Sequence, residues 1–264
     1  MKRPTIAVCL TIHDRPEDVL KRVFDSLLPQ SFDQMVVVLD RAPSRLDGFV
    51  RSYLWDDDRI EIVSIDGGMG WRCPAMAWNT AFGRVRTELV YCLSSETIQE
   101  PGSVRAAAEL LDGPPAIVFG RAECSCGPDG GEVNWNGTAP SNLLCDAAHP
   151  RPLGFIWAGP MWAIRSIGGY DEGFMAGHWY DDNDFFFRLW NLGIPFVFTD
   201  RIGGLHLHHD RHSLSAETIR INHDYIVKKW GKIPVVQPVS SDAVIGRPGI
   251  TVWKGSIGGF WNTR

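Results

Sequence analysis

The first half of the sequence alternates short apolar runs with amphipathic segments, and this alternation constrains the fold more than any other feature. Short apolar runs bounded by polar residues are typical of buried strands, whereas apolar residues spaced by three and four positions are typical of helices. The segment from Pro16 to Leu28 has the helical spacing, and Pro29 follows its end. Strands that alternate with helices predict a mostly parallel sheet with crossover helices, which is an α/β fold.

The expected elements continue along most of the chain. In the first half, strands are predicted at residues 5–11, 35–39, 59–65, 88–93 and 116–120, and helices at 16–28, 45–54, 74–85 and 102–111. In the second half, we expect a strand at 155–164, a helix at 182–192, a strand at 196–199 followed by a Gly-Gly turn, and a helix at 216–230. Residues 121–154 have no period, which predicts a long loop or a β-ribbon of functional importance.

Charge and hydropathy exclude two classes of protein. The formal net charge is −5, and no long basic run is present, so we expect no general nucleic-acid binding. No apolar stretch reaches the roughly 18 to 20 residues that cross a bilayer, so no transmembrane segment is expected. The start of the chain does not resemble a signal peptide. We expect a cytoplasmic protein that is peripheral to a membrane at most.

Polar side chains follow the first two predicted strands, at the edge where open α/β sheets bind ligands. Thr11, Asp14 and Arg15 lie between the first strand and the first helix, and Asp40 closes the second strand. Together with the N–H groups of a helix start, they suit a polar or anionic ligand. The alternative is that Asp14 and Asp40 are simply turn and helix-start residues.

A third predicted strand end carries Ser94, Ser95 and Glu96. Hydroxyl and carboxylate oxygens are ligands that Mg²⁺ and Mn²⁺ prefer, and such ions are often held by one or two carboxylates together with substrate phosphates. The alternative is a strand end that caps the next turn.

Four histidines occur within seven residues, at positions 206, 208, 209 and 212. Core packing does not explain such a group, and imidazole is a common ligand of divalent metals, so metal ligation is favoured. His206 and His209 can share a site if the strand ends there. In an extended strand His206 and His208 lie on one face, which makes His208 the rival of His209.

An acidic cluster of Asp181, Asp182 and Asp184 stands at the start of a predicted helix. Carboxylates there can simply complement the helix dipole. However, crowded carboxylates repel each other, so that one of them can have the raised pKa of a general base. Trp157 and Trp179 lie near glycine-rich or acidic segments, and exposed aromatic faces suit sugar binding.

The order of these features resembles the GT-A fold glycosyltransferases, specifically the inverting family 2 type, over about residues 5–212. TIAVCLTIHDRPEDVLKRVFDSLLPQSF resembles the family's first strand, Thr-x-x-x-Arg turn and first helix, and VVVLDRAP its second strand. CPAMAWNTAF resembles the helix behind the nucleotide, and LVYCLSSETIQEPGSV the strand that ends in Asp-x-Asp. GPMWAIRSIGGYDEGF and HWYDDNDFFFRL match the segments around the catalytic base, and LHLHHDRHS matches a segment that supplies a histidine to the metal.

The resemblance implies a Rossmann-like, mostly parallel nucleotide-binding sheet with helices on both faces and an acceptor-side extension. Residues 1–120 would form the donor half, 121–239 the acceptor half of the same domain, and 240–264 a tail that is a candidate lid. The implied donor residues are Thr11, Asp14, Arg15, Asp40, Asn79, Ser94 and Ser95, and the implied metal ligands are Glu96, His206 and His209. Asp182 would be the base, and Asp181, Asp184, Trp157, Trp179 and Gly169 would position the acceptor, the donor or the helix.

The implied reaction is the inverting transfer of a sugar from a nucleotide diphosphate, with UDP favoured, assisted by Mn²⁺ or Mg²⁺. The acceptor could be a glycan, a lipid-linked sugar, a protein or another hydroxyl compound. The main departure from the family is the Asp-x-Asp position, which reads Ser94, Ser95 and Glu96. One alternative is therefore a non-catalytic member that binds a nucleotide or a sugar. A nucleotidyltransferase is a weaker alternative, because residues 11–16 contain no glycine-rich phosphate loop.

Overall fold

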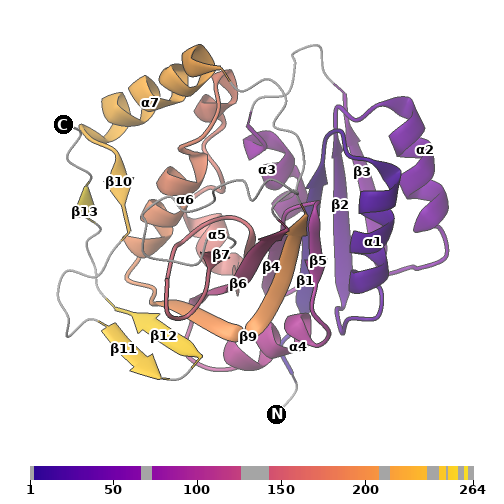
Figure 1. The fold of residues 1–264 in the computed structure, drawn as a ribbon, viewed down its shortest axis with the longest axis horizontal. Helices are drawn as coiled ribbons and strands as arrows, with labels where there is room; N and C mark the ends of the chain where they lie inside the picture. Colours follow the sequence, from indigo (N-terminus) through magenta and orange to yellow (C-terminus); the bar gives the residue numbers. More distant parts are fainter. Residues whose placement is uncertain are drawn as a thin grey trace.

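A computed structural model describes residues 3–66, 73–125, 143–207, 215–236, 244–247, 249–254 and 259–260. A large mixed sheet runs through the molecule in the order β11-β12-β9-β6-β8-β4-β1-β2-β3. Figure 1 shows β2 and β3 toward one end of this sheet and β11 and β12 at the other. The predicted α/β fold is confirmed.

The first four strands form the parallel part of the sheet. They are β1 (Ile6–Ile12), β2 (Gln34–Asp40), β3 (Ile60–Ile65) and β4 (Leu89–Leu93), and β1 pairs in parallel with both β2 and β4. The connecting helices are α1 (Glu17–Leu27), α2 (Ser44–Tyr53) and α3 (Ala75–Arg84). All seven elements lie within one residue of their predicted bounds, because their hydrophobic patterns are regular.

The rest of the chain adds further strands, most of them antiparallel to a neighbour, and further helices. The strands are β5 (Thr97–Gln99), β6 (Ile117–Ser125), β7 (Leu143–Cys145), β8 (Ile156–Pro160), β9 (Phe196–Leu207), β11 (Val244–Arg247) and β12 (Ile250–Trp253), while β10 (Pro234–Val235) pairs with β13 (Gly259–Phe260). The helices are α4 (Ser103–Leu110), α5 (Met161–Ser166), the 3-10 helix η1 (Glu172–Ala176), α6 (Asp181–Trp190) and α7 (Ala216–Trp230). β8 pairs antiparallel with β4 and β6, whereas β6 and β9 are parallel.

The sheet separates two hydrophobic cores, as the alternation along β1 shows. Ile6, Val8 and Leu10 face the core that contains the buried faces of α1, α2 and α4. Ala7 and Cys9 face the core that contains buried residues of α3, α5, α6 and α7. Successive side chains of a strand point to opposite faces, so helices on both faces bury the whole strand.

Three predicted elements differ from the structure. Residues 155–164 are a strand followed by a helix, with Pro160 at the helix N-cap, because a short apolar run does not distinguish a strand from a buried helix. β6 and β9 extend well past residues 120 and 199 because they pair with each other. The expected turn at Gly203 and Gly204 lies inside β9, where an added Cβ would meet Glu100 Oε2 at 2.3 Å or Ile156 Cδ1 at 2.8 Å.

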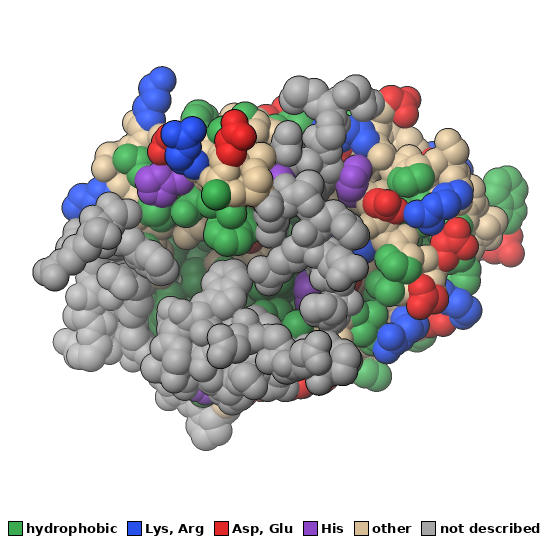
Figure 2. Space-filling model, turned by 45° about the horizontal axis from the view of Figure 1, so that its top comes forward, with side chains coloured by type: hydrophobic (Ala, Val, Ile, Leu, Met, Phe, Trp, Pro, Cys, Tyr) green, Lys and Arg blue, Asp and Glu red, His purple; other side chains and the backbone are tan. Residues whose placement is uncertain are grey.

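Surface ion pairs are frequent in the described part of the chain. Arg45 pairs with Asp14 at 2.8 Å, and Arg51 pairs with Asp47 at 2.9 Å. Figure 2 shows such acidic and basic side chains intermixed on one face of the molecule. Exposed pairs of this kind each contribute little to stability, so the fold rests on the two cores.

The length and apolarity of the helices decide whether any of them can span a membrane. Among the residues that the structure describes, no helix is both long enough and apolar enough to do so.

Candidate active site

The carboxyl ends of β1 and β2 meet at one edge of the sheet, as the strand order predicts. His13 Nδ1 lies 2.7 Å from the backbone oxygen of Asp40. The carboxylate of Asp40 is buried and receives two hydrogen bonds from Arg41, at 2.8 and 3.0 Å. Arg41 has a positive φ of 53°, a backbone conformation that is uncommon outside glycine. This strain marks the end of β2 as a candidate ligand contact, and Arg41 was not among the predicted site residues.

The other predicted residues at this edge of the sheet are less buried than Asp40. Thr11 is half-buried within β1, and Asp14 is half-exposed in its ion pair with Arg45. Ser94 Oγ lies 2.9 Å from Thr97 Oγ1, within the turn that connects β4 to β5. This bond agrees with the turn-capping alternative for Ser94, and its role as a donor contact stays a prediction.

Glu96 joins two segments that are far apart in the sequence. Arg15 Nε donates to Glu96 Oε2 at 3.0 Å, and Ser95 Oγ donates to the same oxygen at 2.9 Å. The other oxygen, Oε1, lies 3.2 Å from His206 Nε2. The pairing of β5 with β9 sets His206 opposite Thr97, which brings the histidine to Glu96. Both side chains are largely buried, with 8% of the Glu96 side chain and 11% of the His206 side chain exposed.

The structure brings together two of the predicted metal ligands, with Glu96 Oε1 3.2 Å from His206 Nε2. Carboxylate oxygen and imidazole nitrogen are both ligands of Mn²⁺. Among the residues that the structure describes, no group of three or more His, Cys, Asp or Glu side chains could hold a metal ion. The predicted ligand His209 and its rival His208 lie outside the described residues.

Asp182 lies in the first turn of α6 and is held by two hydrogen bonds. Gly154 N donates to Oδ2 and the Tyr170 hydroxyl donates to Oδ1, each at 3.1 Å. Burial, reinforced by the negative charge of Asp181, raises the pKa of Asp182 to about 7. Burial also raises the pKa of Asp181, to which the thiol of Cys73 is hydrogen-bonded. A carboxylate with a pKa near neutrality has the proton affinity of a general base.

The backbone before α6 is strained, and α7 holds it. Trp179 and Tyr180 have positive φ values of 68° and 67°, a conformation that costs on the order of 1–3 kcal/mol for each such residue. The fully buried Asn222 of α7 donates from Nδ2 to the backbone oxygen of Trp179 at 3.0 Å. Trp179 keeps 47% of its surface exposed next to the acidic cluster.

Two neighbouring residues connect the Asp182 and Glu96 clusters. Gly154 contacts Asp182, as described above, and the ring of Phe155 packs edge-on against His206 with centroids 5.1 Å apart. The backbone oxygen of Phe155 also accepts a hydrogen bond from Ser94 N at 3.1 Å. The candidate base and the candidate metal ligands therefore lie on either side of residues 154–155, in one site.

Other predicted residues have structural contacts instead. Trp157 is a correction: it was expected as an acceptor platform, but only 1% of it is exposed, because it lies in β8 against Phe82, Phe185 and Phe186. Asp184 is fully buried and bonded to Arg188 at 2.7 Å, Lys229 at 2.7 Å and Trp230 at 2.8 Å. Of its alternative roles, holding the helix is the one that these contacts match.

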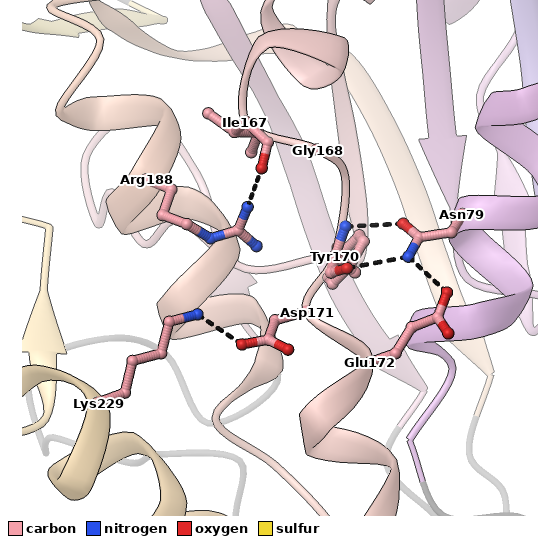
Figure 3. Close-up of a pocket in the computed structure, with 8 residues that line it drawn as sticks. All are labelled: Asn79, Ile167, Gly168, Tyr170, Asp171, Glu172, Arg188 and Lys229. Atoms are coloured by element: carbon pink, nitrogen blue, oxygen red, sulfur yellow. Dashed lines mark hydrogen bonds and ion pairs between the residues drawn. The ribbon is translucent and has the colours of Figure 1, made fainter.

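Asn79 and Gly169 form part of a clamp on the loop between α5 and η1. The amide of Asn79 bonds both the N–H and the C=O of Tyr170, at 2.8 and 2.9 Å. Figure 3 shows this clamp at a pocket of about 440 Å³, which Asn79, Ile167, Gly168, Tyr170, Asp171, Glu172, Arg188 and Lys229 line. Tyr170 was not predicted as a site residue. Its only signal in the sequence is its place after Gly168 and Gly169 and before the acidic cluster.

Comparison with known proteins identifies the fold. The chain is similar to S. aureus TarS 1–349 (13% identity, TM-score 0.54, 78% of this chain and 58% of that chain covered). It is also similar to GalNAc-T7 with UDP, GalNAc and Mn²⁺ (13% identity, TM-score 0.63, 86% of this chain and 49% of that chain covered). A third similar structure is the mannosyltransferase PcManGT from Pyrobaculum calidifontis in complex with GDP-Man and Mn²⁺ (15% identity, TM-score 0.57, 86% of this chain and 61% of that chain covered). The chain thus spans about half to three fifths of these proteins.

These neighbours have the GT-A fold, and the expected fold is confirmed. No curated protein matches the sequence. The family model for glycosyl transferase family 2 matches residues 7–167, which is more than half of the chain. The chain belongs to glycosyl transferase family 2.

Proposed function

We propose that the protein transfers a sugar from a nucleotide diphosphate donor to an acceptor hydroxyl, with inversion at the anomeric carbon. The observation that carries this proposal is the single site around residues 154–155. There a half-buried carboxylate with a pKa of about 7 contacts Gly154, and a carboxylate–imidazole pair contacts Phe155 through the imidazole. The first group is suited to accept a proton and the second to bind a cation, which are the two needs of such a transfer.

Asp182 is the proposed base. It accepts the proton of the acceptor hydroxyl while that oxygen forms a bond to the anomeric carbon. The bond from this carbon to the phosphate oxygen breaks at the same time, and the nucleotide diphosphate leaves with the electron pair. Attack occurs opposite the leaving group, so the configuration inverts. Because the pKa of Asp182 lies near 7, a large fraction of the carboxylate is ionised at neutral pH.

Glu96 and His206 are the residues that would hold a divalent cation, Mn²⁺ or Mg²⁺. When bound, such a cation supplies a Lewis acid that stabilises the charge developing on the diphosphate. Arg15 adds a fixed positive charge beside the same carboxylate, and Arg41 adds one at the end of β2. Guanidinium groups bind phosphate oxygens well, so we assign both arginines to the donor side.

The donor and acceptor are proposed by class. The solved structures that this chain resembles contain UDP in one case and GDP-Man in another. We favour a UDP-sugar because the sequence around Asp40 resembles the uracil or ribose contact of family members. The exposed ring of Trp179 stands next to the acidic cluster, where it would stack on an acceptor that is a glycan, a lipid-linked sugar, a glycosylated protein or another hydroxyl compound.

A thermal-shift panel tests the proposal first. The midpoint of unfolding is measured with UDP, GDP, CDP and TDP, each with and without Mn²⁺, for the wild type and for Glu96→Ala. A ligand that binds only the folded protein raises the midpoint, so we expect a Mn²⁺-dependent rise with UDP that the variant loses. Nucleotide binding without metal dependence or turnover would instead indicate the non-catalytic alternative, which the sequence Ser94-Ser95-Glu96 at the Asp-x-Asp position suggests.

A further inference from the structure

The candidate base has a hydrogen-bond donor on each carboxylate oxygen, and one of the two is a side chain whose position is itself fixed. The hydroxyl of Tyr170 donates to Asp182 Oδ1 at 3.1 Å, while the backbone N–H of Gly154 donates to Oδ2 at the same distance. Together the two donors fix the plane of the carboxylate. Only the first donor belongs to a side chain and can therefore be removed by substitution.

The backbone of Tyr170 is fixed from α3. Asn79 accepts from the Tyr170 N–H at 2.8 Å and donates to its C=O at 2.9 Å, as Figure 3 shows. The preceding Gly169 has a φ of +76°, and a Cβ there would stand 2.3 Å from Asn79 Oδ1. Arg188 of α6 donates to the C=O of Gly169 at 2.7 Å. The loop that carries the tyrosine is thus bonded to two helices.

The ring of Tyr170 is fixed from α6, the helix that carries the base. It is stacked on Phe185 with centroids 4.0 Å apart and an interplanar angle of 2°, and only 3% of Tyr170 is exposed. Phe185 is three residues after Asp182, which places both on the same side of the helix. Trp78 and Phe82 of α3 pack beside the same ring, with their centroids 6.4 and 6.2 Å from that of Tyr170. The hydroxyl therefore has little freedom to turn away from Asp182.

We propose that Tyr170 is the positioning residue of the base: it fixes the orientation of the Asp182 carboxylate through one hydrogen bond and stabilises the ionised form. This inference rests on the proposed function, in which Asp182 accepts the proton of the acceptor. In this proposal, the Gly-Gly-Tyr segment and Asn79 together hold the Tyr170 hydroxyl against one oxygen of the Asp182 carboxylate.

The charge environment of Asp182 makes such a donor necessary. Burial and Asp181 raise the pKa of Asp182, whereas the bonds from Gly154 and Tyr170 lower it. Among the residues that the structure describes, the other titratable groups that interact with Asp182 are Asp181 on the same helix and Cys73 before α3. Burial raises the pKa of the Cys73 thiol well above its ordinary value. Without the phenol, burial and the charge of Asp181, which both raise the pKa, would keep the base protonated at neutral pH.

The test measures the pKa of Asp182 directly, in protein labelled with ¹³C at the aspartate carboxyl carbons. The resonance of Asp182 is assigned by its absence in Asp182→Asn. Removal of a hydrogen bond to a charged group is expected to raise the pKa by about one pH unit in Tyr170→Phe. Tyr225→Phe is the matched control, since it removes a phenol hydroxyl that donates to Asp171 at 2.9 Å and should leave the Asp182 resonance unchanged.

The pH profile of transfer provides the second readout. In Tyr170→Phe the acid limb of kcat should move upward by the same amount, and kcat above this limb should fall about tenfold while KM for the donor is unchanged. An Asp182 pKa and a pH profile that stay within a few tenths of the wild type would overturn the proposal. If Asp182→Asn retains full transfer, the base assignment fails instead, and the NMR titration still reports whether Tyr170 acts on this carboxyl.

A second variant covers the case in which Tyr170→Phe does not fold, as judged from its thermal midpoint. Incorporation of 3-fluorotyrosine in place of Tyr170 keeps the size and the hydroxyl of the ring but makes the phenol a stronger donor. The pKa of Asp182 should then fall by a few tenths of a unit, which is the opposite sign to the first variant. A pKa that does not fall would overturn the inference.

Discussion

Glu96 and Asp182 are both carboxylates of low exposure in one site, yet their surroundings are opposite. Glu96 is bonded to the guanidinium of Arg15, the hydroxyl of Ser95 and the imidazole of His206. Asp182 is surrounded by a neutral phenol, a backbone N–H and a second carboxylate. The same chemical group thus has a cationic side chain, a hydroxyl and an imidazole as partners in one place, and in the other a raised pKa that suits it to take up a proton.

The difference indicates which carboxylate is suited to proton transfer and which to cation binding. Pairs of titratable groups whose environments differ in this way mark the acid–base and the electrostatic roles of an active site. The donor side is assembled from strand ends, where charges find partners at the sheet edge. The proposed base lies at a helix start, where its hydrogen-bond donors are the phenol of Tyr170, stacked on Phe185, and the backbone N–H of Gly154.

The largest expected effect comes from removing the base. Asp182→Asn keeps the shape of the side chain and both hydrogen-bond positions but cannot accept a proton. General base catalysis contributes about 10²- to 10⁴-fold, so we expect a fall of about 10³-fold in kcat. Nucleotide binding, measured by calorimetry, should change less than twofold. A variant that retains more than a tenth of wild-type kcat would contradict the difference between the two carboxylates.

A smaller effect is expected on the donor side. Glu96→Gln keeps the bond to Arg15 geometrically possible but removes the negative charge and weakens the oxygen as a metal ligand. We expect Mn²⁺ affinity in the presence of UDP to fall about 10- to 100-fold, as is typical when a metal site is perturbed. Addition of a chelator to the wild type should reproduce the loss of UDP affinity. Unchanged Mn²⁺ affinity would show that Glu96 is paired with Arg15 and His206 for structural reasons alone.

Much of the donor side could be predicted from the sequence. The strand ends that carry Arg15, Asp40 and Glu96 follow from the hydrophobic pattern, because parallel strands bring their carboxyl ends to one edge. The contact between Glu96 and His206 depends on β5, a three-residue strand that is too short to give a periodic signal. The sequence therefore placed these residues at one edge of the sheet, and the structure shows which of them meet.

The proposed acceptor side could be predicted less completely. The cluster of acidic residues was evident, but their different contacts were not, because these involve distant partners such as Lys229 for Asp184 and Tyr170 for Asp182. Trp157 was assigned to sugar binding because of its neighbouring glycines. Its burial follows from the pairing of β8 with β4 and β6, which no local pattern reveals.

The pH dependence of transfer sharpens the comparison further. In the wild type, a base with a pKa of about 7 should give an acid limb on which kcat falls about tenfold per pH unit below that value. Asp182→Asn should have lost this limb, while Glu96→Gln should keep it at the same position, because Glu96 does not accept the proton. The measurement is the residual rate of both variants between pH 5 and 9. An acid limb that persists in Asp182→Asn would assign the proton to another group.

The smallest expected effect is on stability, and its sign is fixed by the raised pKa. The ordinary pKa of an aspartate is 3.8, and that of Asp182 in the folded protein is about 7, so the folded state binds more protons between these values. Stability therefore decreases as the pH rises through this interval, by linkage. Asp182→Asn removes this penalty, and we expect it to raise the thermal midpoint by a few degrees more at pH 8 than at pH 5. An equal change at both pH values would mean that the carboxylate is already ionised at pH 5, and the environment of Asp182 would then not differ in kind from that of Glu96.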